Sequence, residues 1–307
     1  MPKLRLQTQV SLFSVVILLL LLPGQNPYQT LQLHPQASPI TTLDQLPQLA
    51  DYPIFTGKTA PYTTARSVIV IDVDSAVILY QKNPDTQLMP ASTTKIMTAL
   101  VALEAYDLNQ IVTIKEADES IGHSMHLVKG ETISVENLLY GILVESGNDA
   151  ALALAQNYPG GYQQFVNRMN STAQKLHASN TNFRNVSGVE QYGHVTTVRD
   201  LSIIARFAMQ NPLFAKMVAT KFITVNSSDG TIIHKLGNIN ELLGVVPGLI
   251  GIKTGWTENA GECLGTLTQR QGKSILTVIL GSTDRFGEST SLIEWAFANH
   301  KWETIEI

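Results

Sequence analysis

The sequence predicts a mixed α/β fold of the α+β kind, in which one largely antiparallel sheet is built from both ends of the domain. Strand-like segments stand at the start and at the end of the ordered region, while the segments between them have helical spacing. Short hairpin turns join the strands and favour antiparallel pairing. We therefore expect helices on the faces of the sheet and a central helical insert, rather than two consecutive domains.

The N-terminal strands are predicted at residues 67–72 and 76–81, with Asp74-Ser75 as the hairpin turn between them. A helix is predicted to open at Pro90-Ala-Ser92, because apolar residues then recur at helical spacing from residue 96 to residue 103. The order of these segments places the first helix directly after the first hairpin.

The middle of the chain is predicted to be mainly helical. Helical spacing covers residues 135–144, 150–158 and 162–176, with a short polar break at residues 145–149. Thr197-Val-Arg-Asp200 resembles a capping box with Asp in place of Glu, and it predicts the start of a further helix.

The C-terminal part returns to strands. Residues 221–225 and 231–236 predict a small hairpin. Three further strands are predicted at residues 250–254, 263–268 and 274–280, and a last helix is predicted at residues 288–299.

The composition indicates a globular protein and argues against nucleic-acid binding. The chain has 307 residues, of which 44% are hydrophobic and 15% charged, a balance typical of a globular protein with a full core. The net charge is only −4 and no long basic run occurs, which argues against a nucleic-acid partner. The single cysteine, Cys263, lies in a strand-like run and is expected to be a small buried hydrophobe rather than a nucleophile.

The N-terminus has the pattern of an export signal. Lys3 and Arg5 precede an apolar stretch at residues 10–22, which is short for a membrane span of about 20 residues. No A-x-A-like cleavage site follows, so residues 1–25 are a signal peptide or an uncleaved anchor. Residues 26–62 are rich in Pro, Gln and Thr and are expected to be an extended linker, followed by a folded domain at residues 63–307. We expect the rest of the chain to be exported, to the periplasm or the outer face of the cytoplasmic membrane, with membrane contact only through the N-terminal segment.

The first motif is Ser92-Thr93-Thr94-Lys95, at the predicted helix start. Positions i and i+3 share one helix face, so the Lys95 amine is expected beside the Ser92 hydroxyl. A serine hydroxyl needs a base to become a nucleophile, and a lysine is a base only when it is neutral. By itself the motif also describes an N-cap serine with an exposed lysine one turn later.

The second motif is Ser146-Gly147-Asn148, in the polar break between two predicted helices. A hydroxyl and an amide two residues apart on a tight loop can point into one cleft. Alone, the same residues fit a glycine-containing helix connection capped by Asn148 or Asp149.

The third motif is Lys253-Thr254-Gly255, at the end of a predicted strand. A cation and a hydroxyl suit a substrate carboxylate, and Gly255 permits close approach of a ligand or marks a bulge. Alone, it fits an edge-strand lysine before a turn.

The three motifs occur once each and in the order of the serine β-lactamases and penicillin-binding proteins. Residues 66–299 resemble the D-alanyl-D-alanine carboxypeptidase family of low-molecular-weight penicillin-binding proteins. The further matching segments are Leu138-Leu-Tyr-Gly-Ile-Leu-Val-Glu-Ser-Gly-Asn-Asp-Ala-Ala151, Gly193-His194, Thr196-Thr-Val-Arg-Asp200, Gly251-Ile-Lys-Thr-Gly-Trp-Thr257 and Ala260-Gly-Glu-Cys263. The resemblance implies a β-lactamase/transpeptidase-like fold.

The resemblance also implies roles for individual residues. Ser92 is expected to be the acylated nucleophile, Lys95 its base, and Ser146 the relay of a proton to the leaving D-alanine. The expected substrate-binding residues are Asn148 for the substrate amide, Lys253 for positive charge, Thr254 for the terminal carboxylate, Gly255 beside it, and Trp256, whose backbone N–H completes an oxyanion hole with that of Ser92. No cofactor is expected.

The expected activity is removal of the terminal D-alanine of peptidoglycan stem peptides, with β-lactam antibiotics as covalent inhibitors. DD-endopeptidase or transpeptidase activity shares the same acyl-enzyme and stays open. A class A β-lactamase is disfavoured because no E-x-x-L-N run occurs, and a non-catalytic peptidoglycan or β-lactam sensor because the motif residues are intact.

Arg285, His194 and the pair His123 and His126 were considered as further site residues, and none of them is given a catalytic or metal-binding role. The family usually carries an arginine in the strand-to-helix turn near the C-terminus, but the register of Arg285 is uncertain and no role is assigned to it. His194 is interpreted as structural. His123 and His126 lack a third ligand nearby, so no metal site is expected.

Overall fold

The computed structural model describes residues 51–116 and 122–304. The expected signal or anchor at residues 1–25 lies outside these residues, as does most of the expected linker. Within the described ranges, none of the helices combines the length and the apolar character that a membrane crossing requires.

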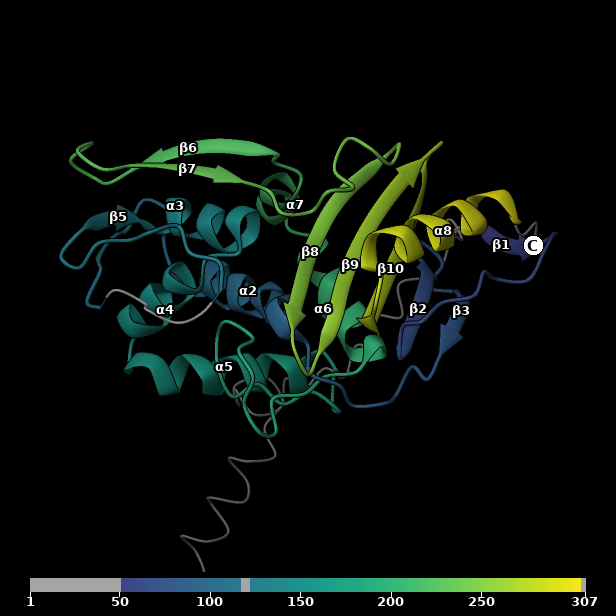
Figure 1. The fold of residues 1–307 in the computed structure, drawn as a ribbon, viewed down its shortest axis with the longest axis horizontal. Coiled ribbons are helices and arrows are strands. Elements are labelled where there is room, and N and C mark those ends of the chain that lie inside the picture. Colours follow the sequence, from purple (N-terminus) through teal and green to yellow (C-terminus); the bar gives the residue numbers. More distant parts are fainter. Residues whose placement is uncertain (1–50, 117–121, 305–307) are drawn as a thin grey trace, which may run out of the picture. The chain divides into compact units, whose positions relative to one another are not determined.

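A five-stranded antiparallel sheet in the order β3-β2-β10-β9-β8 forms the centre of the fold (Figure 1). Its strands are β2 (Ser67–Asp72), β3 (Ile78–Lys82), β8 (Leu249–Thr257), β9 (Gly261–Arg270) and β10 (Lys273–Ser282). Two strands come from the N-terminal side of the domain and three from the C-terminal side. The predicted sheet built from both chain ends is therefore confirmed.

Both faces of this sheet are covered. In β2, Val68 and Val70 belong to the apolar cluster under helix α8 (Arg285–Ala298), while Ile69 and Ile71 belong to the large cluster of the helical side. Successive side chains of a strand point to opposite faces. This explains why β2 reads as a continuous apolar run instead of an alternating one.

The helical part lies between these strands in sequence and packs against the other face of the sheet (Figure 1). It consists of the 3-10 turn η2 (Ala91–Thr94), α2 (Lys95–Ala105), α3 (Val135–Tyr140), the π-turn η3 (Gly141–Glu145), α4 (Asn148–Asn157), α5 (Gly161–Lys175), α6 (Val198–Met209) and α7 (Pro212–Val218). As predicted, the Thr197 side chain caps α6 by accepting from the Asp200 N–H. Residues 135–144 are helical as predicted, but from Gly141 the α-helix α3 gives way to the π-turn η3. Helix α7, capped by Asn211, was not predicted.

Two small strand pairs flank the core. Strands β6 (Phe222–Asn226) and β7 (Ile233–Gly237) form the predicted hairpin. Strands β4 (Ile111–Thr113) and β5 (Thr132–Ser134) pair in a region without a strand prediction.

The start of the domain differs from the expectation. Strand β1 (Tyr52–Phe55) lies within the range expected to be linker, yet it pairs with β11 (His300–Glu303). The Trp295 indole N–H donates to the Lys58 carbonyl at 2.6 Å, which ties the following residues to α8. A four-residue strand with a proline has too little periodicity to be recognised, and its partner is far away in sequence.

Candidate active site

The three motifs meet at one hollow of about 270 Å³, where β8, η2 and the loop after η3 come together. The residues that line it are Ser92, Gly122, His123, Ser146, Asn148, Gly188, Val189, Ile239, Thr254, Gly255, Trp256, Thr257 and Arg285. Six of the eight site residues predicted from the sequence line this hollow. The other two, Lys95 and Lys253, are buried directly behind it.

Ser92 lies on η2, one turn before the buried lysine of α2. The Lys95 Nζ is 3.0 Å from the Ser92 Oγ, 2.6 Å from the Asn148 Oδ1 and 2.8 Å from the Ser187 carbonyl oxygen. The Lys95 side chain is fully buried, and Ile96 and Met97, which follow it on α2, are buried apolar residues. The first motif is therefore not an N-cap serine with an exposed lysine.

Three contacts of the Lys95 amine are compatible with the role of a base. The Asn148 Oδ1 and the Ser187 carbonyl only accept hydrogen bonds, so they take two N–H groups of the amine. A hydroxyl both donates and accepts, so the Ser92 Oγ–H can donate to the lone pair of a neutral amine. In this structure the Lys95 Nζ donates to the Ser92 Oγ, and a neutral amine with the same contacts would accept the Ser92 proton.

Ser146 and Asn148 are placed by the π-turn. Ser146 follows η3 with φ 64°, a left-handed conformation that few residues other than glycine adopt. The Gly147 N–H donates to the Gly141 carbonyl at 2.9 Å and closes the turn. The Ser146 Oγ is buried and has no hydrogen-bond partner in the described structure. A strained backbone and an unsatisfied hydroxyl are typical of a functional position.

Lys253, Thr254 and Gly255 lie on β8, the edge strand of the sheet. Burial, and secondly the charge of Arg285, lower the pKa of Lys253 to about 7. The Thr254 Oγ1 is buried and unpartnered, like that of Ser146. The irregularity of β8 lies between Leu249 and Gly251, so Gly255 does not mark a bulge.

Two glycines allow this close packing. A Cβ on Gly255 would lie 2.9 Å from the Ser92 nitrogen, and a Cβ on Gly188 would lie 1.8 Å from the Ala91 carbonyl oxygen. No side chain fits at either position without moving η2. The space beside Gly255 is therefore used by the backbone that carries Ser92, and the predicted approach of a ligand to Gly255 stays a prediction.

Arg285 is the site residue to which no role was assigned from the sequence. Its Nη1 donates to the Gly255 carbonyl at 3.1 Å, and its backbone N–H donates to the Glu262 carboxylate at 2.7 Å. The Asp284 side chain caps α8 at this point, which fixes where the helix begins. A cap residue directly before the arginine was the local signal that could have settled its register.

The remaining singled-out residues have structural explanations. His194 is buried, and its Nδ1 accepts from the Arg184 N–H at 3.0 Å, so its Nε2 donates to the Thr94 hydroxyl at 2.8 Å. Burial lowers the pKa of His194 to about 4, which keeps the ring neutral. Cys263 is fully buried, and burial raises the pKa of its thiol to about 12. Both interpretations made from the sequence are confirmed.

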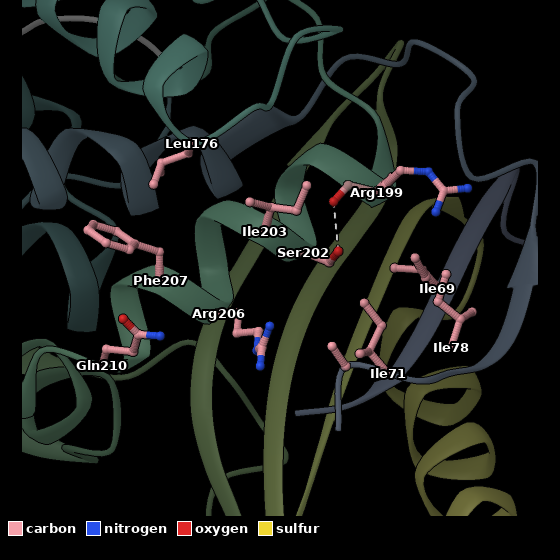
Figure 2. A pocket seen from close by; sticks show the side chains of 11 residues that line it. Ile69, Ile71, Ile78, Leu176, Arg199, Ser202, Ile203, Arg206, Phe207 and Gln210 are labelled. Atoms are coloured by element: carbon pink, nitrogen blue, oxygen red, sulfur yellow. Dashed lines mark hydrogen bonds between the residues drawn. The ribbon is translucent and has the colours of Figure 1, made fainter. Parts of the chain in front are cut away.

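A second hollow lies between α6 and the strands β2 and β3 (Figure 2). It has a volume of about 370 Å³ and is mainly apolar, with Ile69, Ile71, Ile78 and Phe207 among its lining residues. The Ser202 hydroxyl donates to the Arg199 carbonyl of its own helix at 2.7 Å. Because no nucleophile faces a base there, the chemistry belongs to the hollow at Ser92.

The fold and this site define the class of serine β-lactamases and penicillin-binding proteins, in which a serine is acylated beside a buried lysine. Within that class, the sequence profile described as D-alanyl-D-alanine carboxypeptidase matches residues 55–284. The chain belongs to this family of serine peptidases.

Known proteins of the family are similar over most of the chain. A D-alanyl-D-alanine carboxypeptidase of Streptomyces sp. strain K15 is 35% identical over 263 residues, which cover 79% of this chain and 90% of that protein. The D-alanyl-D-alanine carboxypeptidase DacF of Bacillus subtilis is 33% identical over 77% of this chain, a match that spans 63% of that protein's length. The crystal structure of the Streptomyces K15 DD-transpeptidase superposes with a TM-score of 0.75 at 34% identity, covering 78% of this chain and all of that one. A D-alanyl-D-alanine endopeptidase of Pseudomonas aeruginosa is 34% identical over 75% of this chain and 76% of its own length.

Proposed function

We propose that this protein is an exported serine-type carboxypeptidase that removes the terminal D-alanine from peptidoglycan stem peptides. The observation that carries the proposal is the buried Lys95 amine, 3.0 Å from the Ser92 hydroxyl and facing the cationic strand β8 across one hollow. Family membership supports the reaction class, and the charge of the hollow supports a substrate with a free carboxylate.

Acylation begins with transfer of the Ser92 hydroxyl proton to the neutral Lys95 amine. The Ser92 Oγ attacks the carbonyl carbon of the penultimate D-alanine, and the oxyanion accepts hydrogen bonds from the backbone N–H groups of Ser92 and Trp256. The C–N bond then breaks, and the leaving D-alanine amine takes a proton through the Ser146 hydroxyl. Water attacks the ester carbonyl and releases Ser92 with the shortened peptide.

Binding uses the two walls of the hollow. The Asn148 side-chain amide binds the substrate amide, while Lys253 supplies positive charge and Thr254 contacts the terminal carboxylate. Arg285 adds a second cation at the same end, because it already reaches the Gly255 carbonyl. Strand β8 is an edge strand, so an extended peptide can add to it through backbone hydrogen bonds.

The same acyl-enzyme could pass to an amine instead of water. The endopeptidase and transpeptidase names among the similar proteins favour this as the second candidate. β-Lactams would acylate Ser92 in either case and act as covalent inhibitors.

Incubation with a D-Ala-D-Ala pentapeptide, followed by mass spectrometry of the products, distinguishes the candidates. The expected product has lost one alanine, and its yield should not depend on an added amine. A product that is mainly the amine adduct would assign the protein to acyl transfer, and an unchanged peptide would argue against both activities.

We further propose that the N-terminal basic and apolar pattern directs export. The expected result of cell fractionation is the penicillin-labelled protein outside the cytoplasm. Replacing Lys3 and Arg5 by Glu should leave the labelled protein inside the cell.

A further inference from the structure

A strap formed by residues 122–131 runs along the rim of the active site and is bound to the start of α4. The Asp149 carboxylate accepts from the Met125 N–H at 3.1 Å, from the Leu127 N–H at 3.0 Å and from the Ser124 hydroxyl at 2.7 Å. The Asn148 N–H donates to the His123 carbonyl at 2.8 Å. The strap therefore shares its hydrogen bonds with the two residues that follow Ser146-Gly147.

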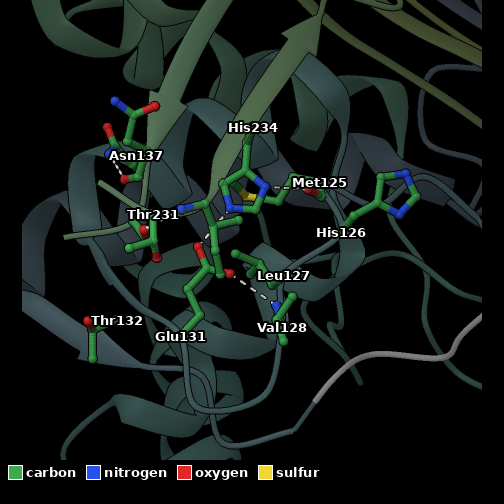
Figure 3. Close-up of polar contacts among 12 residues, drawn as sticks. Met125, His126, Leu127, Val128, Glu131, Thr132, Asn137, Thr231 and His234 are labelled. Atoms are coloured by element: carbon green, nitrogen blue, oxygen red, sulfur yellow. Dashed lines mark hydrogen bonds and ion pairs between the residues drawn. The ribbon is translucent and has the colours of Figure 1, made fainter. Parts of the chain in front are cut away.

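The other side of the strap is held by His234 on β7 (Figure 3). The His234 Nδ1 is 2.8 Å from the Met125 carbonyl oxygen, and its Nε2 is 2.7 Å from the Glu131 Oε1. The second carboxylate oxygen of Glu131 accepts from the Val128 N–H at 3.0 Å. Both side chains are buried, with exposures of 3% for His234 and 0% for Glu131.

This geometry requires a shared proton. The Met125 carbonyl can only accept, so the Nδ1 of His234 carries a hydrogen. A neutral ring then has a lone pair at Nε2, directed at the Glu131 oxygen, and two lone pairs at 2.7 Å repel. The contact is favourable only when one proton lies between Nε2 and Oε1, as an imidazolium with a carboxylate or as an imidazole with a carboxylic acid.

Met125 connects this pair to the catalytic loop. Its carbonyl accepts from His234 and its N–H donates to Asp149, so both of its backbone polar groups are fixed. Its side chain lies against Gly141, where a Cβ would come within 2.3 Å of the Met125 sulfur. Gly141 in turn accepts the bond that closes the π-turn before Ser146. A shift of Met125 therefore moves the segment that positions Asn148 against Lys95.

We propose that Glu131 and His234 are positioning residues for acylation: their shared proton clamps the strap to β7 and, through Met125 and Asp149, fixes Asn148 and the base Lys95. This inference rests on the proposed acylation of Ser92. It adds two residues that do not touch the substrate and that lie on elements without a catalytic motif.

Among the described residues, no other charged side chain forms a hydrogen bond with Glu131 or His234. On the strap, His126 and Lys129 are exposed, and on β7 the neighbouring Lys235 is exposed on the outer face of the hairpin. The Asp149 carboxylate from α4 is occupied by the strap amides, and the Glu145 carboxylate from η3 accepts from the Gly237 N–H at 2.8 Å.

Glu131→Leu tests the clamp, because leucine can bind neither the Nε2 of His234 nor the Val128 N–H. Glu131→Gln is the conservative variant. Its amide oxygen can still accept from the Val128 N–H and its N–H₂ group can donate to a neutral Nε2, so it should keep the strap bound to β7.

The experiment measures two quantities in the full chain at one pH. These are hydrogen-exchange protection of residues 125–128 and the rate of acylation by a fluorescent penicillin. In Glu131→Leu, strap protection should fall and acylation should slow by about tenfold, as displacement of a catalytic group predicts. Glu131→Gln should stay close to the wild type in both measurements. His126→Asn, on the exposed side of the same strap, should follow the wild type in both measurements.

Wild-type acylation or wild-type strap protection in Glu131→Leu overturns the clamp. Wild-type protein that is never labelled instead overturns the proposed acylation, while the exchange measurement still tests the clamp. If Glu131→Leu does not fold, ¹⁵N-histidine labelling of the wild type decides the question, with His234 assigned by comparison with His234→Gln. A proton on Nδ1 of His234 is expected, and a proton confined to Nε2 would overturn the inference.

Discussion

At the scale of single residues, Lys95 is both the proposed base and a structural donor. Lys95→Ala should slow acylation by about 10²- to 10⁴-fold, the usual contribution of a general base. It also leaves the Asn148 Oδ1 and the Ser187 carbonyl without their buried donor, which costs about 1–3 kcal/mol for each unsatisfied group. Labelling kinetics with a fluorescent penicillin measure the first effect, and thermal unfolding measures the second.

Two variants make the Lys95 result interpretable. Lys175→Ala removes an exposed lysine at the end of α5 and should leave both measurements unchanged. Ser92→Ala should fold but give no covalent band. Normal labelling of Lys95→Ala would remove the base role, and labelling of Ser92→Ala would remove the nucleophile.

The proposed recognition of a carboxylate by Lys253 should depend on pH. Its pKa of about 7 means that the amine of the free protein is neutral above that pH and charged below it. A bound carboxylate favours the charged amine, so binding above pH 7 takes up a proton. Affinity for a peptide with a free carboxylate should therefore fall as the pH rises above about 7, by at most tenfold for each pH unit. Calorimetry of Ser92→Ala in two buffers with different ionisation enthalpies measures both affinity and proton uptake.

An amidated peptide is the matched ligand for this test, because it lacks the charge that Lys253 is proposed to bind. Its binding should show no proton uptake. Lys253→Arg keeps the charge at every pH and should flatten the dependence for the free peptide. Equal proton uptake with both peptides would show that Lys253 does not bind the carboxylate.

At the scale of elements, the distance between β8 and η2 is set by Gly255. Gly255→Ala places a Cβ 2.9 Å from the Ser92 nitrogen and 3.0 Å from the Ala91 Cβ, so the two elements must separate. Because the N–H groups of the proposed oxyanion hole lie on these elements, acylation should fall by about 10²-fold or more. Gly265→Ala on β9 is the control, since its Cβ would meet no atom within 4 Å. Equal acylation rates in the two variants would contradict the predicted oxyanion hole.

The elements that the sequence predicts correctly are those with a local signal. Strand β2 was predicted with its observed bounds, and the Thr197 cap marks the start of α6. The strands that were missed, β1 and β11 or β4 and β5, are three or four residues long and form only because a distant partner provides hydrogen bonds. Hydrophobic periodicity cannot show such pairing.

The active site shows the same difference between features that have a local signal in the sequence and features that have none. The three motifs identify the residues that meet at the hollow, because their residue types carry the chemistry. Contacts made by backbone atoms have no signature in the sequence: the Ser187 carbonyl that binds Lys95 and the approach of Gly188 to Ala91 appear only in the fold. Arg285 is different, because Asp284 directly before it is a cap residue that marks the start of α8 and was a usable local signal.

At the scale of the whole molecule, the site exists because the two ends of the domain share one sheet. Strand β2 precedes the helix of Ser92, while β8 follows the entire helical insert. Their common sheet holds β8 beside η2, and the insert contributes Ser146 and Asn148 from the other side. Loss of the global fold therefore separates all three motifs at once, so activity and stability should fall together in acid.

His194 makes the stability of the whole molecule fall in mild acid. Its pKa is about 4 in the folded state and 6.5 when unperturbed. Above pH 6.5 the ring is neutral in both states, and stability is unaffected. Between pH 6.5 and pH 4 only the unfolded chain takes up the proton, so the free energy of unfolding falls by up to about 1.4 kcal/mol per pH unit, roughly 3 kcal/mol in total. Urea unfolding at several pH values measures this slope.

His194→Gln should lower stability at pH 7 but flatten the slope, whereas His126→Asn, an exposed histidine, should keep the wild-type slope. A variant without His194 that loses stability as steeply as the wild type would show that another group causes the acid sensitivity.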